Sequence, residues 1–198
     1  MQRTGRLGRP AHGSSQERPP RLSEPGRAVR GKRFVILASQ FHEPLSRALL
    51  DGAIRTLHRH GVSTGAIRVM WVPGAFELPV VAACVVRRRP RPDAVIALGA
   101  LIKGETLQYG VLAHAVASGL TDVSVRTGIP VTFGVIVADT LAQARARAGL
   151  RSRPGRRRPR LRRDAPARPG AVCNRGEEAA LAALAVLRLL DVSRVRGR

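Results

Sequence analysis

Short apolar, β-branched runs alternate with longer amphipathic segments between residues 34 and 190. Such alternation is typical of βαβ units, in which parallel strands share one sheet that helices cover on both faces. Four of the apolar runs are predicted to be strands, at residues 34–38, 67–72, 94–98 and 131–137. The pattern therefore predicts an α/β fold, a three-layer α/β/α sandwich with a central, mainly parallel four-stranded sheet.

Five amphipathic segments are predicted to be helices, at residues 43–60, 76–86, 107–127, 140–148 and 177–190. The first has an apolar stripe and ends at Gly61, a residue that favours helix C-termini. The last has a stripe of leucines that should pack on the sheet or on a neighbouring subunit: Leu181, Leu184, Leu187 and Leu190. Cys84, inside the second helix, is expected to be a small core residue.

The net charge of +22 is concentrated in two segments. Residues 1–30 hold seven Arg and two acids, and residues 151–173 hold nine Arg and one acid, so together they supply 13 of the 22 charges. Both segments are rich in Pro and Gly and poor in large apolar residues, which is typical of disorder. We expect 1–30 to be a disordered basic tail and 31–198 to be one domain, interrupted by a basic insert at about 151–173.

The same two segments could bind RNA or another polyanion through counterion release. Both lack the aromatic residues on which bases stack, so a nucleic-acid role is not favoured.

No apolar run approaches the roughly 18 to 20 residues that span a bilayer, and the N-terminus lacks the apolar region of a secretory signal. A cytoplasmic protein without a membrane partner is expected. The two cysteines, Cys84 and Cys173, have neither metal-ligand nor disulfide spacing.

Candidate chemistry should lie in the loops after the strands, because ligands of parallel α/β sheets gather at the carboxyl ends of the strands. Those loops span residues 39–42, 73–77 and 99–106. The chain contains no GxGxxG, GxxxxGK[ST], HExxH or GxSxG motif, which argues against the usual nucleotide-binding, zinc-protease and serine-hydrolase classes.

Five motifs with conspicuous composition follow one another along the chain. They are Val72-Pro-Gly-Ala-Phe-Glu-Leu-Pro79, Asp93-Ala-Val-Ile-Ala-Leu-Gly99, Lys103-Gly-Glu-Thr106, Pro130-Val-Thr-Phe-Gly-Val135 and Arg147-Ala-Gly149. In order and spacing this set resembles the 6,7-dimethyl-8-ribityllumazine synthase family, over residues 32–149 and again over 174–190. The resemblance implies a flavodoxin-like fold of the lumazine synthase type.

The activity that the resemblance implies is the condensation of 5-amino-6-(D-ribitylamino)uracil with 3,4-dihydroxy-2-butanone 4-phosphate. The product is 6,7-dimethyl-8-ribityllumazine, in the penultimate step of riboflavin biosynthesis. One substrate supplies the amine nucleophile and the other the ketone electrophile, so no cofactor or metal is implied. The main contribution of such an enzyme should be positioning.

The resemblance also assigns site residues. Phe41 would cover the pyrimidine ring, and Glu77 would accept hydrogen bonds from hydroxyls. The remaining substrate contacts would come from Gly74, Ala75, Phe76, Leu101, Ile102 and Phe133. The phosphate would lie on the backbone of Gly104, Glu105 and Thr106 and against Arg147, with Arg175 as a further candidate. In the family, Phe133, Arg147 and a lysine near the last helix come from the neighbouring subunit of a homopentamer.

Gln108 is one departure from this family, which usually has its proton-transfer histidine at that position. A glutamine cannot exchange a proton near neutral pH, so acid–base help of about 10²-fold could be missing. His114 lies six positions further along, rotated by roughly 240° on a helix, and should point elsewhere. His42, where the family often has asparagine, is a candidate for reaching the site.

The second departure is the length of the segment that precedes Asn174-Arg-Gly176, the counterpart of the family's Asn-Lys-Gly element. Here 24 residues follow Gly149, whereas the family generally has about four. This insert favours a lone pentamer over a larger shell, and association with a riboflavin synthase is left open. Two alternative functions also stay open: a catalytically impaired paralogue that binds a lumazine or flavin, and a basic polyanion-binding scaffold protein.

Overall fold

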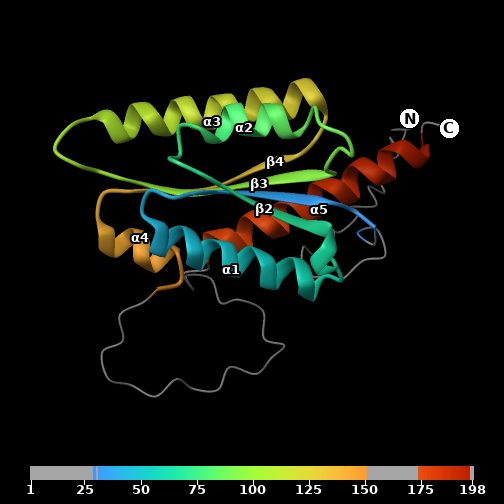
Figure 1. Ribbon diagram of the computed structural model, residues 1–198, viewed down its shortest axis with the longest axis horizontal. Coiled ribbons are helices and arrows are strands. Elements are labelled where there is room, and N and C mark those ends of the chain that lie inside the picture. The colour runs from blue at the N-terminus through green and yellow to red at the C-terminus, as the bar shows by residue number, and fades with distance from the viewer. Residues whose placement is uncertain (1–28, 30, 151–173, 197–198) are drawn as a thin grey trace, which may run out of the picture.

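A computed structural model describes residue 29 and residues 31–150 and 174–196 of the chain (Figure 1). The predicted tail, except for Val29, and the predicted insert at 151–173 lie outside these residues. Within them the strands are β1 (Phe34–Ser39), β2 (Ile67–Val72), β3 (Ala94–Ile102) and β4 (Val131–Ala138). They pair in the order β2-β1-β3-β4, and every pair is parallel. The predicted α/β sandwich is confirmed.

Helices cover both faces of this sheet, as Figure 1 shows. One face packs against α1 (Glu43–Arg59), α4 (Leu141–Arg147) and α5 (Arg175–Arg196), and the other against α2 (Leu78–Val85) and α3 (Gln108–Thr127). Successive β1 side chains alternate between the two resulting cores, with Phe34 and Ile36 on the α1 side and Val35 and Leu37 on the α2 side. A short 3₁₀ turn, Thr64–Ala66, leads into β2.

Several features differ from the prediction, the first three of them in α2 and β3. The second helix begins at Leu78 and not at residue 76, because Glu77 occupies the N-cap position and Pro79 the first turn, where proline is tolerated. β3 continues four residues beyond the predicted end, since it pairs with β4 as far as Ile102 opposite Ala138. Cys84 is exposed and not a core residue, because the buried stripe of α2 consists of Leu78, Ala82 and Val85.

The last helix begins at Arg175, two residues before its predicted start, because Asn174 caps it. Oδ1 of Asn174 accepts hydrogen bonds from the backbone N–H groups of Gly176 (2.8 Å) and Glu177 (3.3 Å). Its Nδ2 donates to the carbonyl of Ala48 in α1 (2.9 Å) and to that of Ala148 after α4 (2.8 Å). One side chain thus joins three helices and fixes the position of Arg175.

Candidate active site at the carboxyl ends of the strands

The loop after β1 is held against the loop after β2 by two backbone hydrogen bonds. The amide of Gln40 donates to the carbonyl of Val72 (2.8 Å), and that of Phe41 donates to Pro73 (3.1 Å). The Phe41 ring is 67% exposed and meets the His42 ring edge-on, with 4.8 Å between the centroids. Phe41 therefore presents an open aromatic face beside the second loop.

Glu77 stands at the end of that second loop, as the N-cap residue of α2. Its side chain accepts no capping hydrogen bond and has no hydrogen-bond or ion-pair partner among the described residues. The carboxylate instead lies over Gly74, where a Cβ would come within 2.9 Å of Oε2. Both carboxylate oxygens can therefore accept hydrogen bonds from a ligand.

The third loop joins β3 to α3 and supplies backbone donors. The amide of Lys103 donates to the carbonyl of Ala138 (2.9 Å), but those of Gly104, Glu105 and Thr106 donate to no described residue. They precede Leu107, the N-cap residue of the 20-residue helix α3, whose N-terminal end carries partial positive charge. Free amides at this position suit an anion such as a phosphate.

These three loops enclose a cavity of about 310 Å³, within the range of small-molecule sites. The cavity lies where the chain order reverses between β1 and β3, the usual ligand position in open parallel sheets. Its lining includes the following predicted site residues: Phe41, His42, Gly74, Ala75, Phe76, Glu77, Leu101, Ile102, Gly104, Thr106 and Gln108. Glu105 is not part of the lining, although its neighbours Gly104 and Thr106 are.

Three lining residues were not predicted: Ala100, Tyr109 and Leu112. Two of them had a signal in the sequence, because Tyr109 adjoins Gln108 and Leu112 follows it one helical turn later. The Tyr109 hydroxyl donates to Oδ1 of Asp139 (3.2 Å), which ties the start of α3 to the end of β4. Tyr109 therefore helps to fix the orientation of the helix end that holds Gln108.

Gln108, at the position of the family's histidine, is the first residue of α3 and lines the cavity. His114 does not line it: this exposed side chain has Nδ1 2.8 Å from the carbonyl of Gly110, one turn earlier on its own helix. Among the described lining residues, the histidine is His42. Its backbone adopts a left-handed conformation, with φ 60°.

Phe133, Arg147 and Arg175 lie together, but not in this cavity. They line a separate hollow of about 260 Å³ along the edge strand β4. Arg147 is exposed and has no ion-pair partner among the described residues, whereas Nη1 of Arg175 donates to Oε2 of Glu178 (2.7 Å). Within one chain, the predicted site residues therefore form two groups in two hollows.

Two other classes of site find no support in the described part of the chain. Residues 29, 31–150 and 174–196 contain no cluster of three or more His, Cys, Asp or Glu side chains arranged to hold a metal ion. Over the same residues, no helix combines the length and the apolar character that crossing a bilayer requires.

The fold and the cavity define an open, parallel α/β protein with a small-molecule site at the switch point of its sheet. The family described as 6,7-dimethyl-8-ribityllumazine synthase matches residues 31–191. A 6,7-dimethyl-8-ribityllumazine synthase of Renibacterium salmoninarum is 46% identical over 127 residues, 64% of this chain and 77% of the relative. The synthase of Gemmatimonas aurantiaca is 41% identical over 164 residues, 81% of this chain and 85% of the relative. The chain belongs to the 6,7-dimethyl-8-ribityllumazine synthase family.

Proposed function

We propose that this protein condenses 5-amino-6-(D-ribitylamino)uracil with 3,4-dihydroxy-2-butanone 4-phosphate to 6,7-dimethyl-8-ribityllumazine, with release of phosphate and water. The observation that carries the proposal is the cavity at the carboxyl ends of β1, β2 and β3, which gathers the predicted substrate-binding residues around Gln108. The family membership of the chain supports the same reaction.

The cavity offers a partner for each part of the two substrates. The exposed Phe41 ring can stack on the pyrimidine, and the unpaired Glu77 carboxylate can accept hydrogen bonds from the ribityl hydroxyls. Leu101 and Ile102 form an apolar wall. The free amides of residues 104–106 receive the phosphate of the butanone, so its ketone lies near the pyrimidine amine.

Catalysis in this site rests mainly on positioning. The 5-amino group attacks the ketone carbon and water leaves, which gives an imine; elimination of phosphate from the neighbouring carbons then yields a second carbonyl. The ribitylamino nitrogen attacks this carbonyl, and loss of a second water closes the ring. Neither C–N bond formation needs a covalent lysine or a metal ion. Holding the two reactants together converts a bimolecular reaction into an effectively unimolecular one, an effect that reaches about 10⁵ M in effective concentration for well-oriented groups. The Gln108 carboxamide orients a reacting group or a water molecule, while proton exchange passes to solvent.

The complete site requires a second copy of the chain. We place Phe133, Arg147 and Arg175 of one subunit against the cavity of its neighbour, because these residues occupy the β4 edge and cannot be part of the cavity in their own chain. A head-to-tail contact of this kind closes into a ring when its rotation allows. The proposed assembly is a homopentamer in the cytoplasm, and no further shell is needed for activity.

The test is the initial rate of lumazine formation from the two substrates, followed by absorbance with purified full-length protein. We expect turnover well above the spontaneous reaction, and a rise of about 10²-fold for Gln108→His, because the variant adds a group that titrates between pH 5 and 8. His114→Gln is the matched control, since it changes an imidazole outside the cavity, and should leave the rate unchanged.

The three outcomes separate clearly. A rate equal to the spontaneous one in the wild type, restored by Gln108→His, would make the protein a ligand-binding paralogue and overturn the proposed activity. A spontaneous rate in both proteins, with intact folding and assembly, would do the same and would point away from Gln108 as the cause. Turnover in the wild type supports the proposal.

A further inference from the structure

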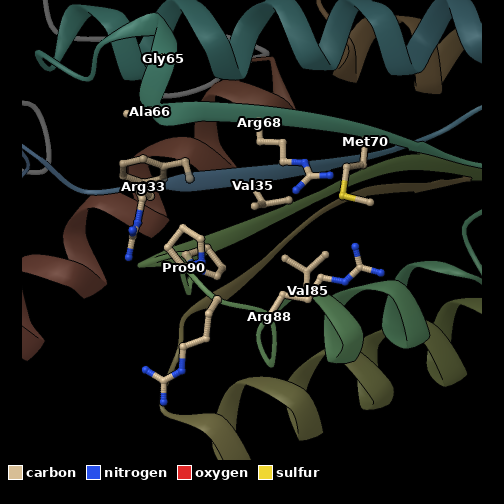
Figure 2. Close-up of a pocket in the computed structure, with 12 residues that line it drawn as sticks. Arg33, Val35, Gly65, Ala66, Arg68, Met70, Val85, Arg88 and Pro90 are labelled. Carbon is tan, nitrogen blue, oxygen red and sulfur yellow. The ribbon is translucent and has the colours of Figure 1, made fainter.

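A second cavity, of about 300 Å³, lies at the opposite end of the sheet (Figure 2). It is formed by the starts of β1 and β2, the end of α2 and the turn that leads into β3. Since β1 is six residues long, with a rise of about 3.3 Å per residue, roughly 20 Å separates this cavity from the proposed active site. Both cavities can therefore be occupied at the same time.

The charge of this cavity is strongly one-sided. Four arginines line it, namely Arg33, Arg68, Arg88 and Arg89, and its lining contains no Asp or Glu. The side chains of Arg68, Arg88 and Arg89 have no ion-pair or hydrogen-bond partner among the described residues. Guanidinium groups remain charged at any physiological pH, and all four of these side chains are exposed, so water and salt screen their mutual repulsion in part. Together they give the cavity a positive potential that favours an anion.

Arg33 does not change this balance. Its guanidinium donates to the carbonyl of Arg91 (2.7 Å), a neutral partner, and keeps its full charge. The neighbouring carboxylate of Asp93 is engaged elsewhere: it accepts the backbone N–H of Arg33 (2.8 Å) and pairs with Lys32 at 3.7 Å.

Beneath the arginines the cavity is apolar. Figure 2 shows Arg68 reaching in from β2 and Arg88 from the segment after α2, with Val35, Met70 and Val85 between them. A planar guanidinium can bind a phosphate through two parallel hydrogen bonds, and an apolar floor can receive a flat ring. The ligand that matches both parts is an anion with an aromatic body.

We propose that this cavity binds a small aromatic phosphate monoester, with its phosphate on Arg68 and Arg88 and its ring on Val35 and Met70. A volume of about 300 Å³ lies at the low end of small-ligand sites, which suits one ring system and one phosphate better than a dinucleotide or a polymer. The site is separate from the proposed active site and goes beyond the synthase reaction.

The test measures binding of adenosine 5′-monophosphate to the full-length protein by isothermal titration calorimetry. We expect saturable binding that Arg68→Gln combined with Arg88→Gln weakens by at least tenfold. Arg87→Gln combined with Arg91→Gln is the matched control, because it removes the same charge from neighbouring exposed arginines that do not line the cavity. This control should change the affinity by less than threefold.

A third variant keeps all the arginines. Gly65 lines the cavity, and a Cβ there meets no atom within 4 Å, so Gly65→Glu adds a carboxylate without crowding the fold. It should weaken binding of the nucleotide by at least tenfold while the thermal unfolding temperature and the rate of lumazine formation stay unchanged. Inorganic phosphate, which lacks the ring, should bind at least tenfold more weakly than the nucleotide.

Several results would overturn the proposal. These are no binding at millimolar nucleotide, equal losses in the cavity and control variants, equal affinities for nucleotide and inorganic phosphate, or competition by butanone phosphate, which would place the nucleotide in the active site. Because the readout is binding and not turnover, a protein without synthase activity would leave this test intact.

Discussion

The two hollows that hold the predicted substrate-binding residues differ in charge. The cavity at the strand ends has one carboxylate, Glu77, and no Lys or Arg in its lining, whereas the hollow on the β4 edge has Arg147 and Arg175 and no acid. A phosphate bound at the free amides of residues 104–106 therefore finds no cationic side chain in the lining of its own cavity. This difference in charge supports the proposal that the cation comes from another copy of the chain.

The cavity and the edge hollow also differ in the hydrogen bonds that hold their walls in place. The cavity loops are joined by the hydrogen bonds of Gln40 and Phe41 to the loop after β2. The edge hollow depends on Asn174, whose side chain holds the start of α5 against α1 and the end of α4. The cavity is built from the loops after three strands, whereas the edge hollow is built from the edge strand β4 and from two helix ends that Asn174 holds together.

The largest effect is expected for Arg147→Ala, which removes the proposed cation without touching the cavity. We expect kcat/KM for the butanone phosphate to fall about 10²-fold, the loss of a charge-assisted hydrogen-bond pair to phosphate. Initial rates over a range of butanone phosphate concentrations measure this fall. Arg145→Ala, on the same helix but outside the edge hollow, is the control and should retain the wild-type rate.

Mixing two impaired variants tests whether the cation comes from another copy. Subunits with Arg147→Ala keep an intact cavity, and subunits with Glu77→Ala keep an intact edge hollow. When the two are refolded together into one ring, about a quarter of the interfaces combine the two intact halves and should regain activity. If the mixture shows no more than the summed activity of the two variants, the two halves act within one chain.

A smaller effect is expected for Asn174→Ala, which breaks the connection between α5, α1 and α4. The loss of a helix cap and of two bonds between helices should lower the free energy of unfolding by about 2–3 kcal/mol. Thr140→Ala removes only a cap, that of α4, and should cost about 1 kcal/mol. Urea unfolding followed by circular dichroism measures both, and equal losses would show that the bonds of Asn174 to Ala48 and Ala148 contribute nothing.

Most of the fold could be predicted, because strands buried on both faces give continuous apolar runs with clear ends. The misplaced helix ends have local causes that the apolar pattern does not show. Asn174 followed by Glu177 is a capping signal that the leucine stripe obscured. The prediction that Cys84 is a core residue was wrong, because α2 buries only one narrow side although its sequence is apolar all round.

The cavity half of the site could be predicted because the carboxyl ends of parallel strands must meet at one edge of the sheet. Its motifs give the loop residues directly. The position of the edge hollow depends on which strand lies at the edge of the sheet. That strand is β4, because β3 pairs with β1 on one side and with β4 on the other. Long-range pairing of this kind leaves no signature in a single segment.

Gly74→Ala should alter the cavity without altering its charge. The added Cβ would lie 2.9 Å from Oε2 of Glu77, so the carboxylate must turn away from the ribityl position. We expect activity to fall about tenfold, the loss of one hydrogen bond to a charged group, with less than about 1 kcal/mol lost in stability. Gly110→Ala, where a Cβ meets nothing within 4 Å, should leave activity unchanged. An unchanged rate for Gly74→Ala would mean that Glu77 does not contact the substrate.

The smallest effect is expected at His42, the imidazole that lines the cavity. Its left-handed backbone, with φ 60°, is one that asparagine tolerates well, so His42→Asn should change the free energy of unfolding by less than about 0.5 kcal/mol. His42→Ala, which lacks a side chain able to stabilise this conformation, should cost about 1 kcal/mol.

The pH profile of the same variant decides whether His42 replaces the proton-transfer histidine that Gln108 does not provide. If positioning accounts for the rate, His42→Asn keeps both the rate of lumazine formation and its dependence on pH between 5 and 8. If the His42 imidazole exchanges the proton, the variant loses about 10²-fold in rate and becomes independent of pH over that range. The first result is expected, because the His42 ring lies edge-on against Phe41, the proposed stacking surface for the pyrimidine, and supports that ring.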